Sequence, residues 1–348
     1  MGNEELKPDQ ALLSVKNLSI GLYRGFKTGK PHLFSAVEDI SFDIYPGEIL
    51  ALVGESGSGK SLTALAIPGL LGPNKAVTAG SIVYHRPPGI DLLTLPEKEL
   101  EGIRGKEISI IFQEPFSSLN PLVRVGKQIA EVLELHGERG KKPPKNQIER
   151  QVRELLIKLK FPDPDKISET FPHQLSGGMC QRIMIAMAVI LKPRLLIADE
   201  PTTALDKSTQ EEIISLLKEI NKDFGTSVLF ISHDLSLVKN FSSRVLVIYS
   251  GRILENGSTE EVFLHPAHEY TKGLLGSIPG PGTEGGSIKR RNLYNIPGKI
   301  PSLEEGRPGG CPFHPRCGKA EPICKTAFPP EKTAGFNHST RCILEAEK

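Results

Sequence analysis

Two stretches near the beginning of the chain, Leu12 to Ile20 and Ala36 to Ile44, alternate apolar and polar side chains. Such alternation is typical of a strand with one buried face. Five later runs are short and almost continuously apolar, which indicates strands buried on both faces of a parallel sheet. These runs are Ile49 to Val53, Ile108 to Phe112, Arg194 to Ala198, Val228 to Ile231 and Val245 to Tyr249.

Helical periodicity fills much of the sequence between those runs. The predicted helices are Lys127 to Leu135, Asn146 to Leu159, Gly178 to Leu191 and Ser208 to Phe224. Strands that alternate with helices predict an α/β fold with a largely parallel sheet. The interval from Phe116 to about Lys192 is mostly helical and lies between two core strands, so we interpret it as an inserted helical subdomain.

Charge and hydropathy exclude several classes of protein. Lys and Arg total 43 against 41 Asp and Glu, and the chain has no basic block of the kind that binds nucleic acid. No stretch of about 18 apolar residues predicts a transmembrane helix. The N-terminus carries Glu4 and Glu5 and lacks the pattern of a secretory signal. We therefore expect a cytosolic protein, and a reducing compartment disfavours disulfides.

A phosphate-binding loop is predicted directly after the run that ends at Val53. The segment from Gly54 to Ser61 reads Gly-Glu-Ser-Gly-Ser-Gly-Lys-Ser and fits the pattern G-x-x-x-x-G-K-[ST]. Glycines let backbone N–H groups turn inward around phosphate, Lys60 would reach the β- and γ-phosphates, and Ser61 would ligate Mg²⁺. A glycine-rich turn that binds nothing is the alternative, which the preceding strand disfavours. The residues expected to contact ATP are Gly54, Ser56, Gly57, Ser58, Gly59, Lys60, Ser61 and Leu62.

A second set of catalytic residues is predicted at the end of the apolar run that finishes at Ala198. Ligands bind at the carboxyl ends of strands in open α/β sheets, and Asp199 and Glu200 stand at such an end. Asp199 would hold the Mg²⁺ shell, mostly through water, and Glu200 would be the general base for the attacking water. A capped strand end is the alternative, and the upstream phosphate loop favours the catalytic interpretation.

A motif at the start of a predicted helix, Leu175-Ser-Gly-Gly-Met179, resembles the signature motif of the ABC ATPases. The similarity of this chain to that family extends over about residues 11 to 270. It implies a P-loop NTPase (RecA-like) core with antiparallel β strands and the helical subdomain, within residues 1–272. Ser176, Gly177 and Gly178 would contact the γ-phosphate held by an opposing subunit, which implies a head-to-tail dimer with ATP between the subunits. A serine helix cap followed by glycines is the alternative.

Three further residues stand in the order of the family's motifs. Gln113 resembles the Q-loop glutamine, which senses Mg²⁺ and connects to the membrane subunit. Asp206, in Ala204-Leu-Asp206, resembles the D-loop residue at the dimer seam, and His233 resembles the switch histidine that contacts the γ-phosphate.

The adenine contact is assigned by the same resemblance, which implies an aromatic residue shortly before the second strand. Tyr23 occupies that place, and an insertion-like stretch from Gly25 to Pro31 follows it. Phe26 and Phe34 compete for the role, and ordinary packing is an alternative for all three.

Two departures from the commonest ABC pattern resemble the first of two ATPase subunits in bacterial dipeptide, oligopeptide and nickel importers. Met179 replaces the usual glutamine, and Gln113 is followed by Glu114 to Pro121, near the groove for a permease helix. The resemblance implies a second, non-identical ATPase, two transmembrane permease subunits, and indirectly an extracytoplasmic binding protein. Hydrolysis of ATP would then power peptide import from the cytoplasmic face of the membrane. The alternatives are a nickel or other small-solute importer and a soluble, non-transport ABC ATPase.

Residues 273–348 are rich in Pro and Gly and are predicted to form a separate extension. Asn295 to Ser302 and Gly310 to Cys317 resemble the C-terminal extension of this importer group. Four cysteines, with five, six and 17 residues between them, suggest a metal centre in a segment that has few core residues. Zn²⁺ sites usually contain cysteine pairs only two to four residues apart, so we expect a [4Fe–4S] cluster rather than Zn²⁺. His314 or His338 is a substitute ligand, and two disulfides are the alternative. The expected ligands are Cys311, Cys317, Cys324 and Cys342.

Overall fold

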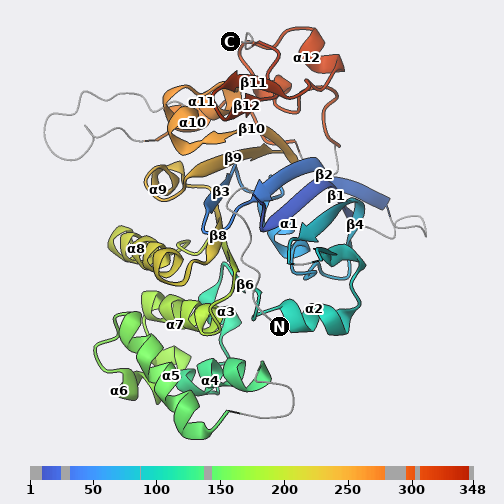
Figure 1. Ribbon diagram of the computed structural model, residues 1–348. Coiled ribbons are helices and arrows are strands. Elements are labelled where there is room, and N and C mark those ends of the chain that lie inside the picture. The colour runs from blue at the N-terminus through green and yellow to red at the C-terminus, as the bar shows by residue number, and fades with distance from the viewer. Residues whose placement is uncertain are drawn as a thin grey trace, which may run out of the picture. The chain divides into compact units, whose positions relative to one another are not determined.

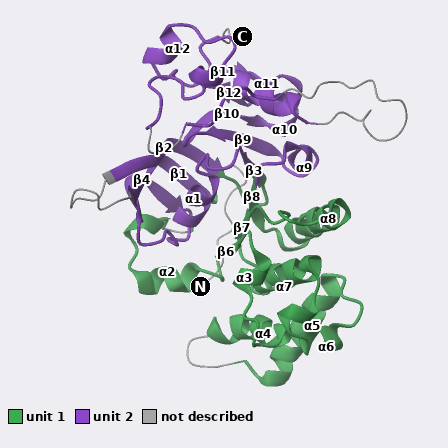
Figure 2. Cartoon of the chain, turned by 180° about the vertical axis from the view of Figure 1, so that it is seen from behind, with its two compact units in different colours: residues 1–12, 44–49, 86–231 green, residues 13–43, 50–85, 232–348 purple. Residues whose placement is uncertain are grey.

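The computed structural model describes residues 10–24, 32–86, 88–136, 143–278, 295–301 and 306–344, and its elements are labelled in Figure 1. The chain forms two compact units, which Figure 2 distinguishes by colour. Unit 1 comprises Met1–Leu12, Ile44–Ile49 and Arg86–Ile231. Unit 2 comprises Leu13–Asp43, Leu50–His85 and Ser232–Lys348. Within the described ranges, no helix has the length and hydropathy needed to cross a membrane.

Unit 1 contains three parallel strands that pair side by side. They are β6 (Ile108–Ile111), β7 (Leu195–Asp199) and β8 (Ser227–Ser232), with β7 in the middle. Ile108 pairs with Leu195, and Leu195 pairs with Ser227. Parallel neighbours need a crossover connection, and the 18-residue helix α8 (Lys207–Phe224) makes the one between β7 and β8. The apolar runs were therefore correctly interpreted as buried parallel strands.

Helices occupy most of unit 1 between β6 and β7. They are α3 (Pro115–Ser118), α4 (Val125–Leu135), α5 (Lys145–Lys158), α6 (Pro164–Ser168), the short 3₁₀ turn η2 (Pro172–Gln174) and α7 (Gly177–Val189). On α5 the buried side chains are Ile148, Val152, Leu155 and Leu156, a spacing that places them on one helical face. Unit 1 also contains β5 (Ile90–Asp91), η1 (Leu92–Thr94) and α2 (Glu97–Ile103).

Unit 2 contains an antiparallel sheet in which β1 lies between β2 and β4. The three strands are β1 (Leu13–Arg24), β2 (His32–Ile44) and β4 (Lys75–Tyr84). Leu13 pairs with Tyr84 at one end of the β1–β4 ladder, and Leu22 pairs with Lys75 at the other. The alternating pattern predicted β1 only as far as Ile20, and β4 was not predicted.

The second sheet of unit 2 joins the strand before the phosphate loop to the C-terminal extension. In order across the sheet its strands are β11 (Lys332–Gly335), β12 (His338–Thr340), β10 (Arg252–Ser258), β9 (Arg244–Tyr249) and β3 (Ile49–Val53). The smaller helices of this unit are α1 (Lys60–Ala66), α9 (Leu235–Lys239), α10 (Thr259–Leu264), α11 (Glu269–Gly276), η3 (His314–Arg316) and α12 (Ile323–Thr326). The extension thus adds a hairpin to the sheet that carries the phosphate loop.

Aromatic side chains provide the extension with an apolar core. The Phe313 ring lies 5.4 Å from the Tyr249 ring and 5.2 Å from the Tyr270 ring, measured between centroids. Phe313 is 3% exposed, and both tyrosines are fully buried. The extension is therefore packed on β9 and α11, and the premise of a core-poor segment was wrong.

The prediction of a metal centre in the extension is also wrong. Cys311, Cys317, Cys324 and Cys342 border one small cavity next to Phe313, and all are free cysteines. Among the residues described, no group of three or more His, Cys, Asp or Glu side chains is arranged to hold a metal ion. This finding overturns both the [4Fe–4S] assignment and the Zn²⁺ alternative. Burial raises the pKa of the Cys311 thiol to about 11 and also raises the pKa of Cys317. The β11–β12 hairpin and the buried Phe313 stabilise the extension in place of a metal.

Replacing Phe313 with Ala is expected to lower the free energy of unfolding of unit 2 by about 3–5 kcal/mol, because truncating a buried Phe removes apolar burial and leaves a cavity. Urea unfolding and protease cleavage after residue 306 would measure the loss. The matched control is Phe336→Ala, since Phe336 is 86% exposed and its loss should change stability by less than about 0.5 kcal/mol. Equal stability of the two variants would contradict the assignment of Phe313 to the core.

Candidate nucleotide-binding and hydrolysis site

The predicted phosphate loop connects β3 to α1 within unit 2. All five residues of β3 are buried, and the strand leads directly into Gly54. A Cβ atom on Gly54 would lie 2.1 Å from the carbonyl oxygen of Ile248, so only glycine allows this close approach. Gly57 and Gly59 have φ angles of 78° and 103°, which glycine adopts without steric cost. The conformation of the loop therefore requires the glycines of the motif.

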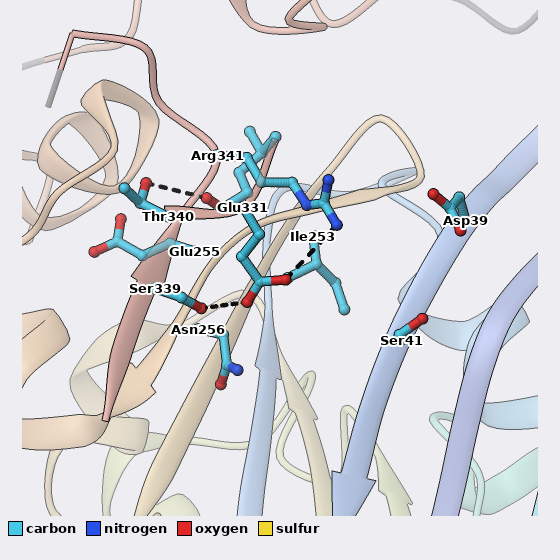
Figure 3. Close-up of a pocket in the computed structure, with 10 residues that line it drawn as sticks. Asp39, Ser41, Ile253, Glu255, Asn256, Glu331, Ser339, Thr340 and Arg341 are labelled. Atoms are coloured by element: carbon cyan, nitrogen blue, oxygen red, sulfur yellow. Dashed lines mark hydrogen bonds and ion pairs between the residues drawn. The ribbon is translucent and has the colours of Figure 1, made fainter. Parts of the chain in front are cut away.

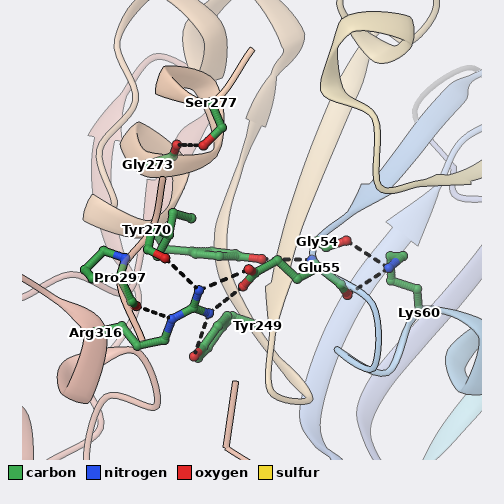
Figure 4. Close-up of polar contacts among 10 residues, drawn as sticks. Gly54, Glu55, Lys60, Tyr249, Tyr270, Gly273, Ser277, Pro297 and Arg316 are labelled. Atoms are coloured by element: carbon green, nitrogen blue, oxygen red, sulfur yellow. Dashed lines mark hydrogen bonds and ion pairs between the residues drawn. The ribbon is translucent and has the colours of Figure 1, made fainter. Parts of the chain in front are cut away.

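Lys60 places its ammonium group inside this loop. The residue is 4% exposed, and its Nζ donates hydrogen bonds to the carbonyl oxygens of Gly54 at 2.8 Å and Glu55 at 3.0 Å (Figure 4). The Ser58 hydroxyl is also buried and has no hydrogen-bond partner among the residues that the structure describes. A buried ammonium and a buried hydroxyl in a glycine loop are suited to charge-assisted hydrogen bonds with phosphate oxygens. Ser61 and Leu62 follow in the first turn of α1.

The predicted catalytic residues of unit 1 meet at the end of β7. Asp199 is the last residue of that strand and is 6% exposed. Gln113 Nε2 donates to Glu200 Oε2 at 3.2 Å, and the Thr203 hydroxyl donates to the same oxygen at 3.0 Å. The structure therefore brings Gln113 and Glu200 together. Thr203 was missed, although its position three residues after Glu200 was a usable signal.

Glu200 also has an unusual backbone conformation. Its φ of 46° is in the left-handed region, which costs a non-glycine residue about 1–3 kcal/mol and is often retained at functional sites. The Glu200 N–H donates to the carbonyl oxygen of Ile231 at 3.1 Å, a contact that holds the residue at the carboxyl end of β8.

The signature and D-loop residues lie on neighbouring helices of unit 1. Ser176 caps α7 and accepts a hydrogen bond from the Met179 N–H at 3.3 Å. Asp206 caps α8 and accepts from the N–H and hydroxyl of Thr209 at 3.0 and 2.7 Å, and these hydrogen bonds lower the pKa of Asp206. A Cβ atom on Gly178 would lie 2.5 Å from the Thr209 methyl group, so glycine permits close packing there. Ser176 is thus a helix cap in this chain, and its contact with a partner's nucleotide stays a prediction.

His233 and Tyr23 are both exposed residues of unit 2. His233 follows β8, and Tyr23 is 39% exposed near the end of β1. Phe34 is half-buried on β2, whereas Phe26 and the stretch from Gly25 to Pro31 lie outside the described residues. The switch role of His233 and the adenine-stacking role of Tyr23 stay predictions.

Another pocket of unit 2 is lined by residues of β2, β10 and β12, and Figure 3 shows it in close-up. Asp39 and Glu331 are the acidic residues at its rim, whereas the Glu255 carboxylate is fully buried and accepts hydrogen bonds from the N–H groups of Ala267 and His268. Glu331 accepts a hydrogen bond from the Ser339 hydroxyl at 2.6 Å and lies 3.7 Å from the Arg341 guanidinium. Because the Asp39 and Glu331 carboxylates would repel a polyphosphate, this pocket is a poor nucleotide site.

A set of polar contacts that the sequence did not predict surrounds Glu55 of the phosphate loop. Arg316 from the C-terminal extension donates to the two carboxylate oxygens of Glu55 at 2.7 and 3.1 Å (Figure 4). The Glu55 N–H donates to the Tyr270 hydroxyl oxygen at 2.9 Å. Glu55 occupies an undefined position of the loop motif, and Arg316 is 261 residues away, so no local signal connected them.

A buried lysine in a glycine loop, together with an acidic residue pair after a core strand, defines a P-loop ATPase. Residues 37–203 match the family profile described as ABC transporter, and residues 254–324 match the oligopeptide/dipeptide transporter C-terminal region. The chain belongs to the ATP-binding proteins of the ABC transporter family.

Curated relatives match nearly the whole chain. The Oligopeptide transport ATP-binding protein OppD of Escherichia coli is 45% identical over 322 residues, which cover 92% of this chain and 90% of the relative. The Dipeptide transport ATP-binding protein DppD of Bacillus subtilis is 42% identical, and the match covers 97% of this chain and 96% of that relative. Among solved structures, a dimeric ATP-binding cassette with bound ADP and phosphate has a TM-score of 0.61 at 28% identity, covering 71% of this chain and 98% of that one.

Proposed function

We propose that this chain is the ATP-hydrolysing subunit of an ABC transporter that imports dipeptides or oligopeptides. The observation that carries hydrolysis is the carboxylate of Glu200, held by Gln113 and Thr203 directly after a buried core strand. Peptide import is supported by the relatives from Escherichia coli and Bacillus subtilis, whose names state peptide transport, and by the match to the oligopeptide/dipeptide C-terminal region.

In the proposed reaction, a water oxygen attacks the γ-phosphorus of ATP. The bond between the γ-phosphorus and the β–γ bridging oxygen breaks, and ADP leaves with the electron pair of that bond. Glu200 orients the water and accepts its proton, while Lys60 and the loop N–H groups bind the phosphates. Ser61, Gln113 and Asp199 offer oxygen donors, the type that Mg²⁺ prefers, and fit it as ligands or through water. When bound, Mg²⁺ would neutralise charge on the phosphates. His233 would contact the γ-phosphate and Tyr23 the adenine.

The proposed assembly contains a second, non-identical ABC ATPase, two transmembrane permease subunits and, indirectly, an extracytoplasmic binding protein. Ser176, Gly177, Gly178 and Asp206 would act across the seam between the two ATPases. Exposed apolar side chains near Gln113 support a permease contact, since Phe116 is 54% and Leu122 is 84% exposed. The subunit would lie on the cytoplasmic face of the membrane. Residues 1–272 would form the nucleotide-binding domain, with its helical subdomain at about 116–192, and residues 273–348 the extension.

Reconstitution tests this proposal together with the role of the signature motif. Proteoliposomes with the permease subunits and both ATPases should take up peptide only when ATP is supplied. The variant Ser176→Arg should abolish uptake, because a bulky cation would block closure on the partner's nucleotide. The isolated variant should still bind ATP with an affinity within about threefold of the wild type, since Ser176 belongs to α7 and not to the phosphate loop. ATP-independent uptake would exclude the proposed function, and loss of ATP binding by the isolated variant would refute the partner-side role.

A further inference from the structure

The C-terminal extension makes a direct ionic contact with the phosphate loop. Both nitrogens at the end of the Arg316 guanidinium engage the Glu55 carboxylate, in the two-pronged geometry that is the strongest form of this pair. The Arg316 side chain is 5% exposed and that of Glu55 is 26% exposed. The pair is thus largely shielded from water. Charge interactions are stronger in such a shielded site than on an open surface.

Arg316 is fixed from the side of the extension as well. Its Nε donates to the carbonyl oxygen of Pro297 at 2.9 Å, and Nη1 lies 3.4 Å from the Tyr249 hydroxyl oxygen. Burial lowers the pKa of Arg316, but the hydrogen bonds and charge interactions with Glu55 and Tyr249 together raise the pKa overall, so the guanidinium stays charged. The extension therefore presents a rigidly held cation to the loop.

Glu55 is placed where its charge matters for a nucleotide. Its backbone carbonyl oxygen accepts a hydrogen bond from the Lys60 ammonium at 3.0 Å, whereas its carboxylate faces Arg316. An unpaired carboxylate at this position would repel a polyphosphate. The Tyr270 hydroxyl holds the Glu55 N–H, and Arg316 draws the side chain toward the extension (Figure 4).

We propose that Arg316 is a positioning residue for ATP binding: by pairing with Glu55 it neutralises and orients the one carboxylate of the phosphate loop. The C-terminal extension thereby sets the nucleotide affinity of the core. This inference rests on the ATP site of the proposed function. A role of Arg316 restricted to anchoring the extension would also involve these contacts, but removing the Glu55 charge would then not restore what the loss of Arg316 costs.

The test measures the Kd for ATP of the full-length chain by displacement of a fluorescent ATP analogue. Arg316→Met should raise the Kd about tenfold, because the bared Glu55 carboxylate opposes the phosphates. Glu55→Gln should not weaken ATP binding, and the double variant Glu55→Gln/Arg316→Met should return to within about threefold of the wild type. An anchoring role predicts no such rescue, so a double variant that binds as weakly as Arg316→Met would overturn the proposal. An unchanged Kd in Arg316→Met would overturn it as well.

Two further variants keep the test decisive. Arg316→Lys retains the charge and should keep the Kd within about threefold, even if the methionine variant proves unstable. Arg341→Met is the matched control, because Arg341 pairs with Glu331 inside the extension and its loss should leave the Kd unchanged. A wild-type chain that does not bind ATP would refute the proposed function, whereas binding that is indifferent to all these variants would refute only the role of Arg316.

Discussion

Replacement of Glu200 by Gln is expected to reduce ATP hydrolysis by the assembled transporter by a factor of about 10² or more. Glutamine keeps the shape of the side chain, but its amide is not a base and cannot take the proton of the attacking water. The amide oxygen of the new residue can still accept hydrogen bonds from Gln113 and Thr203, so the local structure should persist. ATP binding should stay within about threefold of the wild type, since Glu200 is outside the phosphate loop. Phosphate release and nucleotide binding would be measured on the same preparation.

The matched control for this variant is Glu219→Gln. Glu219 is a surface carboxylate of α8 that pairs with Lys160 at 2.6 Å, and exposed pairs of this kind contribute about 0–1 kcal/mol to stability. Its loss should leave hydrolysis unchanged. Equal turnover by Glu200→Gln and the wild type would exclude Glu200 as the base and would make the hydrogen bonds at its carboxylate purely structural.

Local sequence signals located the nucleotide motifs because each depends on neighbours in the chain. The run Ile49 to Val53 is followed by an obligatory glycine, and β3 has those bounds. Asp206 caps the start of α8 because its carboxylate satisfies the Thr209 N–H, and Gly225 caps the end of that helix with a φ of 66°. A cap and a left-handed glycine can be recognised from a few residues.

The C-terminal extension was predicted poorly because its structure depends on contacts that are distant in sequence. The β12 strand pairs with β10 through Glu255 and Thr340. Its three residues, His338, Ser339 and Thr340, are all polar and gave no strand signal. Phe313 is buried by Tyr249 and Tyr270, which no local pattern could indicate. Cysteine spacing predicts a metal site from residue type alone, whereas the packing around these thiols depends on residues that are distant in sequence.

Replacement of Lys60 by Ala is expected to weaken ATP binding by a factor of about 10² or more. A unit charge interacting with a phosphate charge about 4 Å away contributes about 4 kcal/mol at an effective dielectric constant of about 20. Lys60 is 4% exposed, so water cannot easily replace the lost ammonium group. The carbonyl oxygens of Gly54 and Glu55 would also lose their donor, which should loosen the loop. Titration with a fluorescent ATP analogue would measure the change in Kd.

Lys60→Arg separates the effect of charge from that of shape. The ammonium is a compact point charge that fits between two carbonyl oxygens, whereas the guanidinium is planar and wider and cannot occupy the same space. We therefore expect Lys60→Arg to restore less than about a tenth of the wild-type affinity, although it preserves the net charge. Lys158→Ala, which removes a lysine paired with Asp223 in unit 1, is the control and should leave the Kd unchanged. Full affinity in Lys60→Arg would mean that charge alone binds the phosphates, and full affinity in Lys60→Ala would exclude this loop as the nucleotide site.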